Sequence, residues 1–310
     1  MTIETGALEQ AYAKVESAYG VQPADALSAT DGIRHLELAL SSKKNREASP
    51  EKRGTPDEAQ SLPRRQSQTW NLSSIMWEPS GTVGTPSNVA KFLKAGMGAQ
   101  TTPNLVTTVA AAPAPTTTGC DLTSVVGLAV GDIIIFTVAT GRQATRVKTI
   151  AANSITYDAL SVAPTVPGAA VSGVNFKLSN NITESLAIYK YYNAGNFKQA
   201  AYGSVVDQIQ IGCDGTREVM LALQGPAGQW ADATFGTVQA KPGAHTTVGA
   251  PASGLVGNFY VDGTAFLVIA CQVTIANALE LRNKELGTQW ASGIAGRTAM
   301  RKITASVTFY

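Results

Sequence analysis

Apolar and polar residues alternate from one position to the next along several stretches of this 310-residue chain. The alternating stretches are 33–40, 65–77, 186–191, 205–211, 219–223 and 303–309. A period of two residues is typical of half-buried β-strands, so the pattern predicts a mainly β protein. The last of these stretches must pair with a neighbour or leave an open sheet edge.

Two of these strands carry residues that define a core face. In the stretch 33–40, one face is expected to hold Leu36, Leu38 and Leu40, and the other His35 and Glu37. In the stretch 65–77, one face holds Trp70, Leu72 and Met76, and the other Ile75 and Trp77. The second strand is therefore expected to be covered on both sides near its end.

Helical spacing is present in two places. Leu8, Tyr12, Val15 and Tyr19 recur every three or four residues before Gly20, which predicts a helix over residues 4–19. A second, short helix is expected to begin at a Thr85 or Ser87 cap, with Pro86 near its first position, and to end at Gly96 and Gly98. Its apolar stripe, the candidate core of a helix that flanks a sheet, consists of Val89, Phe92, Leu93 and Met97.

Composition divides the chain into segments. Residues 41–64 are almost free of apolar side chains and predict a long exposed arm or hairpin tip, either docked on a neighbour or simply solvated. Residues 101–118 are rich in Ala, Pro and Thr and predict a linker. Short β-branched runs between turn residues predict a small inserted all-β barrel or sandwich of about five strands at 119–174. Residues 1–100 and 184–310 would then form the main domain.

Charged residues make up only 15% of the chain, against about 25% in a typical soluble protein. Either other subunits cover much of the surface, or the surface is rich in Thr, Ser, Gln and Asn, and composition alone slightly favours the second. The net charge of +2 does not indicate a nucleic-acid partner. The sequence begins without a secretory signal pattern and contains no apolar run of membrane-spanning length, so a soluble protein is expected.

The sequence offers little catalytic chemistry. Its two histidines, His35 and His245, have no nucleophile motif nearby, and neither GxSxG nor HExxH is present. The acidic residues lack metal-ligand spacing, so we expect no catalytic residue, metal, cofactor or enzymatic activity. Carboxylates far apart in sequence could still form a glycosidase pair. Cys120, Cys213 and Cys271 are widely spaced outside any CxxC motif, which favours small buried side chains in a reducing compartment.

Basic residues gather in and around the expected arm and define a candidate inter-subunit contact. They are Lys43, Lys44, Arg46, Lys52, Arg53, Arg64 and Arg65. Acidic residues are interleaved with them, and no aromatic residues are available for base stacking. Such a mixed segment favours contact with a neighbouring protein surface over the tracking of phosphates.

Three stretches, taken in order, resemble the tail tube proteins of long-tailed, siphovirus-type bacteriophages. The first is the strand and arm followed by TWNLSSIMWEPSGTVGTPSNVAKFLKAGMGA, and the second is SLAIYKY with the later AAYGSVVDQIQIGCDGTREVMLALQG. The third is RKITASVTFY. Together they cover roughly residues 31–99, 184–228 and 264–310, a little over half of the chain, and their order and spacing carry the resemblance.

The resemblance implies a β-sandwich or barrel with a flanking helix that closes into hexameric rings, which stack into a hollow tube for DNA delivery. The arm and chain termini would contact neighbouring subunits, and the inserted module would lie on the tube exterior. The implied partners are further copies of this chain, the tail terminator, the tape measure and distal tail proteins, and DNA that passes without specific binding. The implied location is the virion tail, after synthesis in the bacterial cytoplasm.

Two other functions stay open at this point. Another tail component that forms rings, such as a tail terminator or distal tail protein, would assemble into rings without forming long tubes. A carbohydrate- or receptor-binding module is suggested by the inserted segment and by Tyr189, Tyr191 and Tyr192, although a buried hairpin face is favoured for these tyrosines.

Overall fold

The computed structural model describes residues 9–48, 61–78, 80–192, 197–232, 237–243, 245, 250–254, 259–261 and 264–309. Strands account for most of the regular structure, which confirms a mainly β protein. The helical elements of the described residues are α1 (Ala90–Met97) and the short 3-10 turn η2 (Ala29–Asp31).

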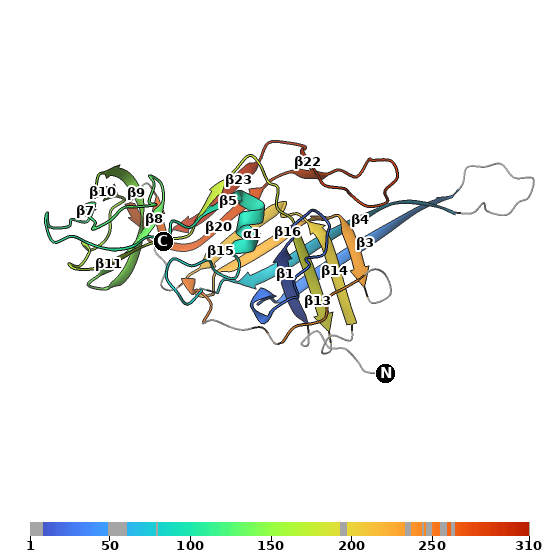
Figure 1. The fold of residues 1–310 in the computed structure, drawn as a ribbon, viewed down its shortest axis with the longest axis horizontal. Helices are drawn as coiled ribbons and strands as arrows, with labels where there is room; N and C mark the ends of the chain where they lie inside the picture. Colours follow the sequence, from blue (N-terminus) through green and yellow to red (C-terminus); the bar gives the residue numbers. More distant parts are fainter. Residues whose placement is uncertain are drawn as a thin grey trace, which may run out of the picture.

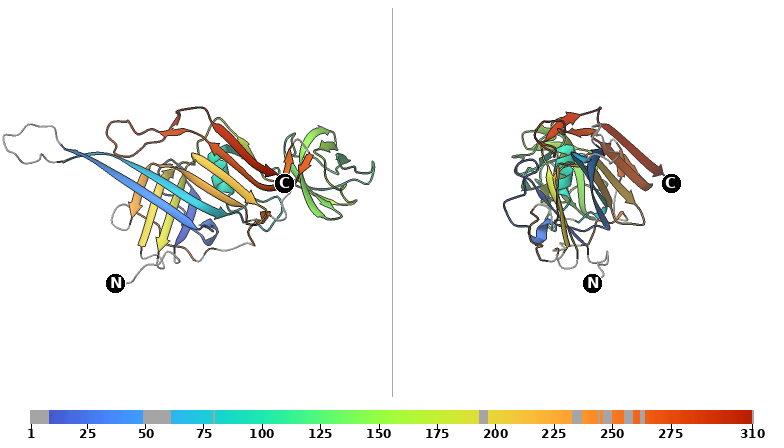
Figure 2. Two further views of the ribbon diagram at one scale, coloured as in Figure 1. Left: turned by 180° about the vertical axis from the view of Figure 1, so that it is seen from behind. Right: turned by 90° about the vertical axis from the view of Figure 1, so that its right-hand side faces the viewer.

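Six antiparallel strands form the main sheet, in the order β23-β20-β15-β16-β4-β3, which is curled into a half-barrel (Figures 1 and 2). Their bounds are β3 (Glu37–Ala48), β4 (Ser61–Met76), β15 (Gln208–Asp214), β16 (Met220–Ala227), β20 (Val268–Ala276) and β23 (Lys302–Phe309). β3 and β4 stay paired as far as Ala48 and Ser61, so the two ends of the expected arm form a ribbon that extends beyond the rest of the sheet (Figure 1).

A second sheet packs against the main sheet and has the order β17-β14-β13-β1-β2. Its strands are β1 (Gln10–Val15), β2 (Gly32–Ile33), β13 (Leu186–Tyr192), β14 (Phe197–Ser204) and β17 (Gln229–Asp232). The alternate residues of β13 enter two different apolar clusters, so this sheet is covered on both faces.

The shared core lies between the two sheets and is closed at one flank by α1. Its buried members include Leu72, Ile209 and Leu221 of the main sheet, Leu186 and Ile188 of the second sheet, and Val89, Phe92 and Leu93 of the helix segment. Asn277 is fully buried beside this core, where its Nδ2 donates to the carbonyl oxygens of Gly96 (2.8 Å) and Val206 (3.2 Å). This side chain therefore fixes the end of α1 to the connection before β15.

A third sheet, which we call the module sheet, has the order β6-β11-β8-β9-β10-β7 and its own apolar core. Its strands are β6 (Val106–Thr108), β7 (Gly119–Asp121), β8 (Ile133–Val138), β9 (Gly141–Ala151), β10 (Ser154–Tyr157) and β11 (Ala169–Ser172). An isolated bridge between Val109 and Leu122 brings its two outer strands together. The module sheet lies at one end of the molecule and the β3–β4 ribbon at the other (Figure 1).

Three further strand pairs complete the regular structure. They are β5 (Gly98–Thr101) with β12 (Asn175–Leu178), β18 (Phe259–Val261) with β19 (Thr264–Phe266), and β21 (Leu279–Leu281) with β22 (Ile294–Arg297).

The helix expected over residues 4–19 is wrong, because residues 10–15 form β1, which pairs with β13. Ala11 and Ala13 enter the shared core, whereas Tyr12 enters the cluster on the opposite face. Because both faces of β1 carry apolar residues, apolar and polar residues do not alternate along this strand. The spacing of the large apolar residues then resembles that of a helix. Residues 4–8 lie outside the described part of the chain.

The faces of the first two expected strands also need correction. Leu36 precedes β3 and is 66% exposed, whereas the His35 side chain is buried and lies 3.2 Å from a carboxylate oxygen of Glu9. In β4, Ile75 shares the core face with Trp70 and Leu72 instead of facing away. A bulge at Ser74, where φ is +55°, adds one residue and reverses the alternation.

The boundaries of α1 differ from the prediction at both ends. Val89 is the N-cap residue, so neither Thr85 nor Ser87 caps the helix through its side chain. Gly96 lies inside the helix, and Gly98 ends it in the left-handed conformation with φ of +91°.

The expected linker at 101–118 contains structure. β6 pairs with β11, and Val109 is 2% exposed within the core of the module sheet. Val106, Thr107 and Thr108 continue the alternation of a strand, so tertiary pairing orders a segment whose Ala, Pro and Thr content is typical of linkers.

Candidate assembly surfaces

The two faces of the main sheet differ in chemistry. One face carries the shared core, and the alternate residues define the opposite surface, which we call the polar face. Its polar members on the inner strands and on β23 are Asn71, Ser73, Gln208, Gln210, Gln224, Gln272, Thr274, Thr304, Ser306 and Thr308. The same rows also hold Met76, Gly212, Met220, Ala222, Ala270 and Ala276, and Ala39 and Ser41 extend the face onto β3. None of these side chains is charged, and all are half-buried or exposed.

Amide and hydroxyl groups face one another across this surface. The Gln224 Nε2 donates to Gln208 Oε1 at 2.5 Å, and a shallow cavity of about 180 Å³ lies between these side chains, Asn71 and Ser73. Charged residues in the same rows stand at strand ends, as Glu37 and Lys302 do. The polar face therefore presents hydrogen-bonding groups with little fixed charge.

Both lateral edges of the main sheet lack a further strand among the described residues, and we call them open in this sense. The beginning of the β3 edge is covered at Leu38, whose N–H donates to Glu9 and whose carbonyl oxygen accepts from Lys190. β23 pairs with β20 on one side and β3 pairs with β4 on one side, and each is the outermost strand of the sheet (Figure 2). β23 is exposed along nearly its whole length, and Ile303 remains 51% exposed although it is apolar. A long, exposed edge strand is a template for pairing with another chain.

The structure places the candidate arm residues as follows. Lys43 is exposed on β3 opposite Ser67, one position beyond the last pair of β4 with β16. Lys44 and Arg46 belong to β3, and Arg64 and Arg65 belong to β4, whereas Lys52 and Arg53 lie outside the described residues. The basic residues of the described ribbon therefore begin where it leaves the body of the sheet.

The candidate helix residues face the opposite side of the main sheet from the polar face. Val89 and Phe92 are fully buried and Leu93 is 2% exposed, and Met97 packs against the same core while partly exposed. The ring centroids of Phe92 and Trp70 are 6.5 Å apart, so the helix covers the indole of β4.

Both histidines take part in charged clusters with carboxylates, of which Glu78 is buried and Glu9 half-buried. The Glu78 side chain is 1% exposed and accepts from Arg34 at 2.9 Å, and the Nε2 atom of His245 lies 3.1 Å from it. Glu9 lies 3.2 Å from both His35 and the Lys190 ammonium group. Burial opposes ionisation of Glu9, but hydrogen bonds from His35 and Lys190 lower its pKa overall. These contacts tie distant segments together.

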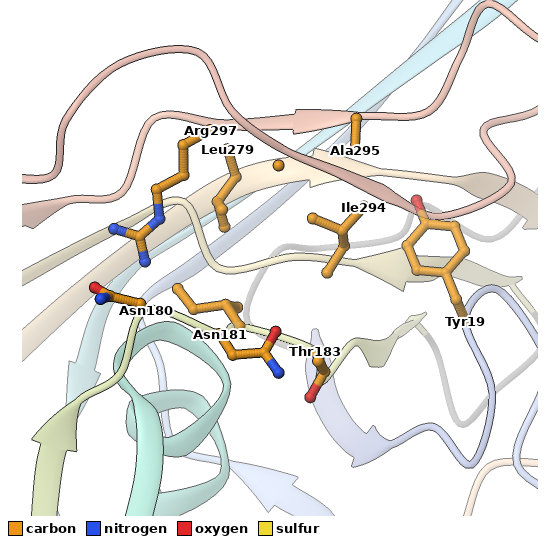
Figure 3. Close-up of a pocket in the computed structure, with 10 residues that line it drawn as sticks. Tyr19, Asn180, Asn181, Thr183, Leu279, Ile294, Ala295 and Arg297 are labelled. Atoms are coloured by element: carbon orange, nitrogen blue, oxygen red, sulfur yellow. The ribbon is translucent and has the colours of Figure 1, made fainter.

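Figure 3 shows a cavity of about 340 Å³ beside β21 and β22, with Asn180, Asn181, Thr183 and Arg297 around it. Burial raises the pKa of Tyr19, another lining residue, above its usual range. None of the ten described residues that line this cavity is a carboxylate, histidine or cysteine. Elsewhere in the described ranges, no group of three or more His, Cys, Asp or Glu side chains could hold a metal ion.

Tyr189 and Tyr191 are fully buried in the cluster that covers the second sheet, with their rings stacked at 6.4 Å. They offer no surface to a ligand.

The described part of the chain also contains no helix that is long and apolar enough to cross a membrane.

Comparisons with known proteins return no match: no family model fits the chain, and no curated protein is similar to it. The polar face is the feature that sequence reasoning missed. Its signal is the choice of Gln, Ser, Thr and Asn, instead of charged residues, at the polar positions of the alternating strands.

Proposed function

We propose that this chain is the structural subunit of a bacteriophage tail tube, which assembles into rings that stack around a channel for DNA. The observation that carries the proposal is the main sheet, with one face covered, the other polar and almost uncharged, and both edges open. The resemblance of residues 31–99, 184–228 and 264–310 to tail tube proteins supports it independently of this geometry.

The two edges explain how copies of the chain would associate. β23 of one copy would pair with the β3 edge of the next, a head-to-tail contact in which different surfaces meet. Repetition of such a contact by rotation closes a ring. The β3–β4 ribbon, with its mixed charges, would reach a neighbouring subunit or ring.

The polar face suits the wall of a DNA channel. Lysine and arginine side chains that neutralise phosphates release counterions and hold the duplex, so a basic wall would slow its passage. A wall of amides and hydroxyls provides no such attraction. We infer that the polar face lines the channel, while the basic residues of the ribbon lie at subunit contacts and the module sheet lies outside.

Another ring-forming tail component is the second candidate, because the same edges would serve a single ring. Stacking distinguishes the two. The carbohydrate-binding alternative loses one of the two features that suggested it, since Tyr189 and Tyr191 are buried.

The test is negative-stain electron microscopy of the purified protein over a range of concentrations, with two matched variants. Ile303→Lys places a charge on the exposed edge strand, and Val126→Lys places one at an 80% exposed apolar position in the module segment. We expect the wild type and Val126→Lys to form stacked rings or tubes, and Ile303→Lys to remain folded but unassembled.

Single rings that never stack would favour the terminator or distal tail role. Assembly of Ile303→Lys as efficient as that of the wild type would contradict the pairing of β23. Loss of assembly in Val126→Lys alone would contradict the exterior position of the module.

A further inference from the structure

Two of the three cysteines, far apart in the sequence, lie directly opposite each other in the main sheet. Cys213 on β15 is the register partner of Cys271 on β20, although 58 positions separate them in the chain. Directly opposed residues of antiparallel strands have Cα atoms about 4.5–5.5 Å apart. This separation falls within the range of about 4.4–6.8 Å found across disulfides.

The two thiols are also neighbours in the structure. The Cys213 Sγ donates a weak hydrogen bond to the carbonyl oxygen of Cys271 at 3.6 Å. Burial raises the pKa of the Cys271 thiol, and the adjacent Cys213 thiol raises it further. Neither cysteine takes part in a disulfide in this structure.

The surroundings give the pair unequal access to reagents. Both residues alternate with the polar face, so their side chains point to the opposite side of the main sheet, as those of Ile211 and Val273 do. Cys271 is buried at 6% exposure, whereas Cys213 is half-buried. A small reagent therefore meets Cys213 first.

We propose that Cys213 and Cys271 form a redox-active dithiol that a low-molecular-weight disulfide converts into a cross-strand disulfide between β15 and β20. This inference does not depend on the proposed tail function. The chain would hold two thiols in a reducing cytoplasm and gain the bond in an oxidising medium.

The reaction consists of two thiol–disulfide exchanges. The Cys213 thiolate attacks one sulfur of the reagent disulfide, whose S–S bond breaks and releases one thiol. The Cys271 thiolate then attacks Cys213 Sγ, the mixed disulfide breaks, and the second thiol leaves. The two protein thiols are oxidised, the reagent is reduced, and the two released thiols carry the protons.

The experiment treats the full chain with hydroxyethyl disulfide and follows intact mass, non-reducing peptide maps and thermal unfolding. We expect a mass lower by about 2 Da and a peptide that links residues 213 and 271. The bond closes a long loop, so the unfolding temperature should rise by about 5 °C. Reductant should reverse both changes.

Three variants provide the controls. Cys120→Ser should still close the disulfide, because Cys120 is buried in the separate core of the module sheet. Cys213→Ser and Cys271→Ser should not close it, and Cys271→Ser should stop at a mixed disulfide on Cys213. A wild-type protein that does not react, that stops at the mixed disulfide, or that forms only disulfides between chains would overturn the proposal. The wild-type peptide map decides the outcome even if a variant fails to fold.

Discussion

Gly96 lies in the last turn of α1, where the helix lies close to Ile209 of the main sheet. A Cβ atom added at Gly96 would lie 2.5 Å from Cδ1 of Ile209 and 2.8 Å from Cγ1 of Val206. The carbonyl oxygen of Gly96 is also held by Asn277, which limits how far this turn can move away. Replacement of Gly96 by alanine therefore sets two effects of opposite sign against each other.

Helix propensity favours the alanine by about 1 kcal/mol. An additional methyl group in a packed core costs about 1–3 kcal/mol, because side chains must leave their rotamers or the backbone must shift. Cδ1 of Ile209 is the end of a flexible side chain and can yield in part, but Cγ1 of Val206 is closer to the backbone. We expect Gly96→Ala to lower the free energy of unfolding by up to about 2 kcal/mol.

Urea denaturation followed by tryptophan fluorescence measures this free energy, and Ile209→Val provides the matched partner. Ile209→Val alone removes the closest atom and should cost about 1 kcal/mol. In the Gly96→Ala background it should cost nearly nothing, which gives a coupling energy of about 1 kcal/mol. An increase in stability in Gly96→Ala, or strictly additive single effects, would refute the close approach of this turn to β15.

Two further predictions concern buried carboxylates. Burial raises the pKa of Glu16 above its ordinary value of 4.5, so the folded protein holds this proton more tightly than the unfolded chain. The free energy of unfolding of the wild type relative to Glu16→Gln should be highest below about pH 4.5 and fall as the pH rises through the folded-state pKa of Glu16. Urea titrations of both proteins at several pH values measure this difference. A difference that does not vary with pH would contradict the expectation. Glu78→Gln should lose about 2–3 kcal/mol of stability because it weakens the bonds to Arg34 and His245 at a buried position. The exposed Glu37→Gln is the control, and equal effects of the two substitutions would show that Glu78 has no special role.

Elements whose two faces differ in polarity are predictable from the sequence alone. In β16, Leu221 and Leu223 alternate with Ala222 and Gln224, and the strand forms with the leucines in the core. The predicted apolar side of α1 also lies in the core, since Val89 and Phe92 are buried. In these segments the local period and the tertiary environment agree, so the period identifies both the element and its buried face.

The local pattern fails where both faces of a strand are covered or where the register shifts. Tyr12 and Val15 fit a helical spacing, yet their segment is a strand because two apolar clusters flank the second sheet. Ile75 changes faces because Ser74 bulges. Neither the second cluster nor the bulge leaves a distinct signal within a short window of sequence.

The sequence by itself determined the mainly β class, the alternation along the central strands and the low charge of their polar positions. It also placed the polar, mixed-charge segment between two strands. Only the tertiary structure decided which strands are neighbours, and with that the continuous polar face, the two open edges and the opposition of Cys213 to Cys271. The physical reason is that strand pairing depends on contacts between distant parts of the chain, whereas the two-residue period records only which side of each strand is apolar.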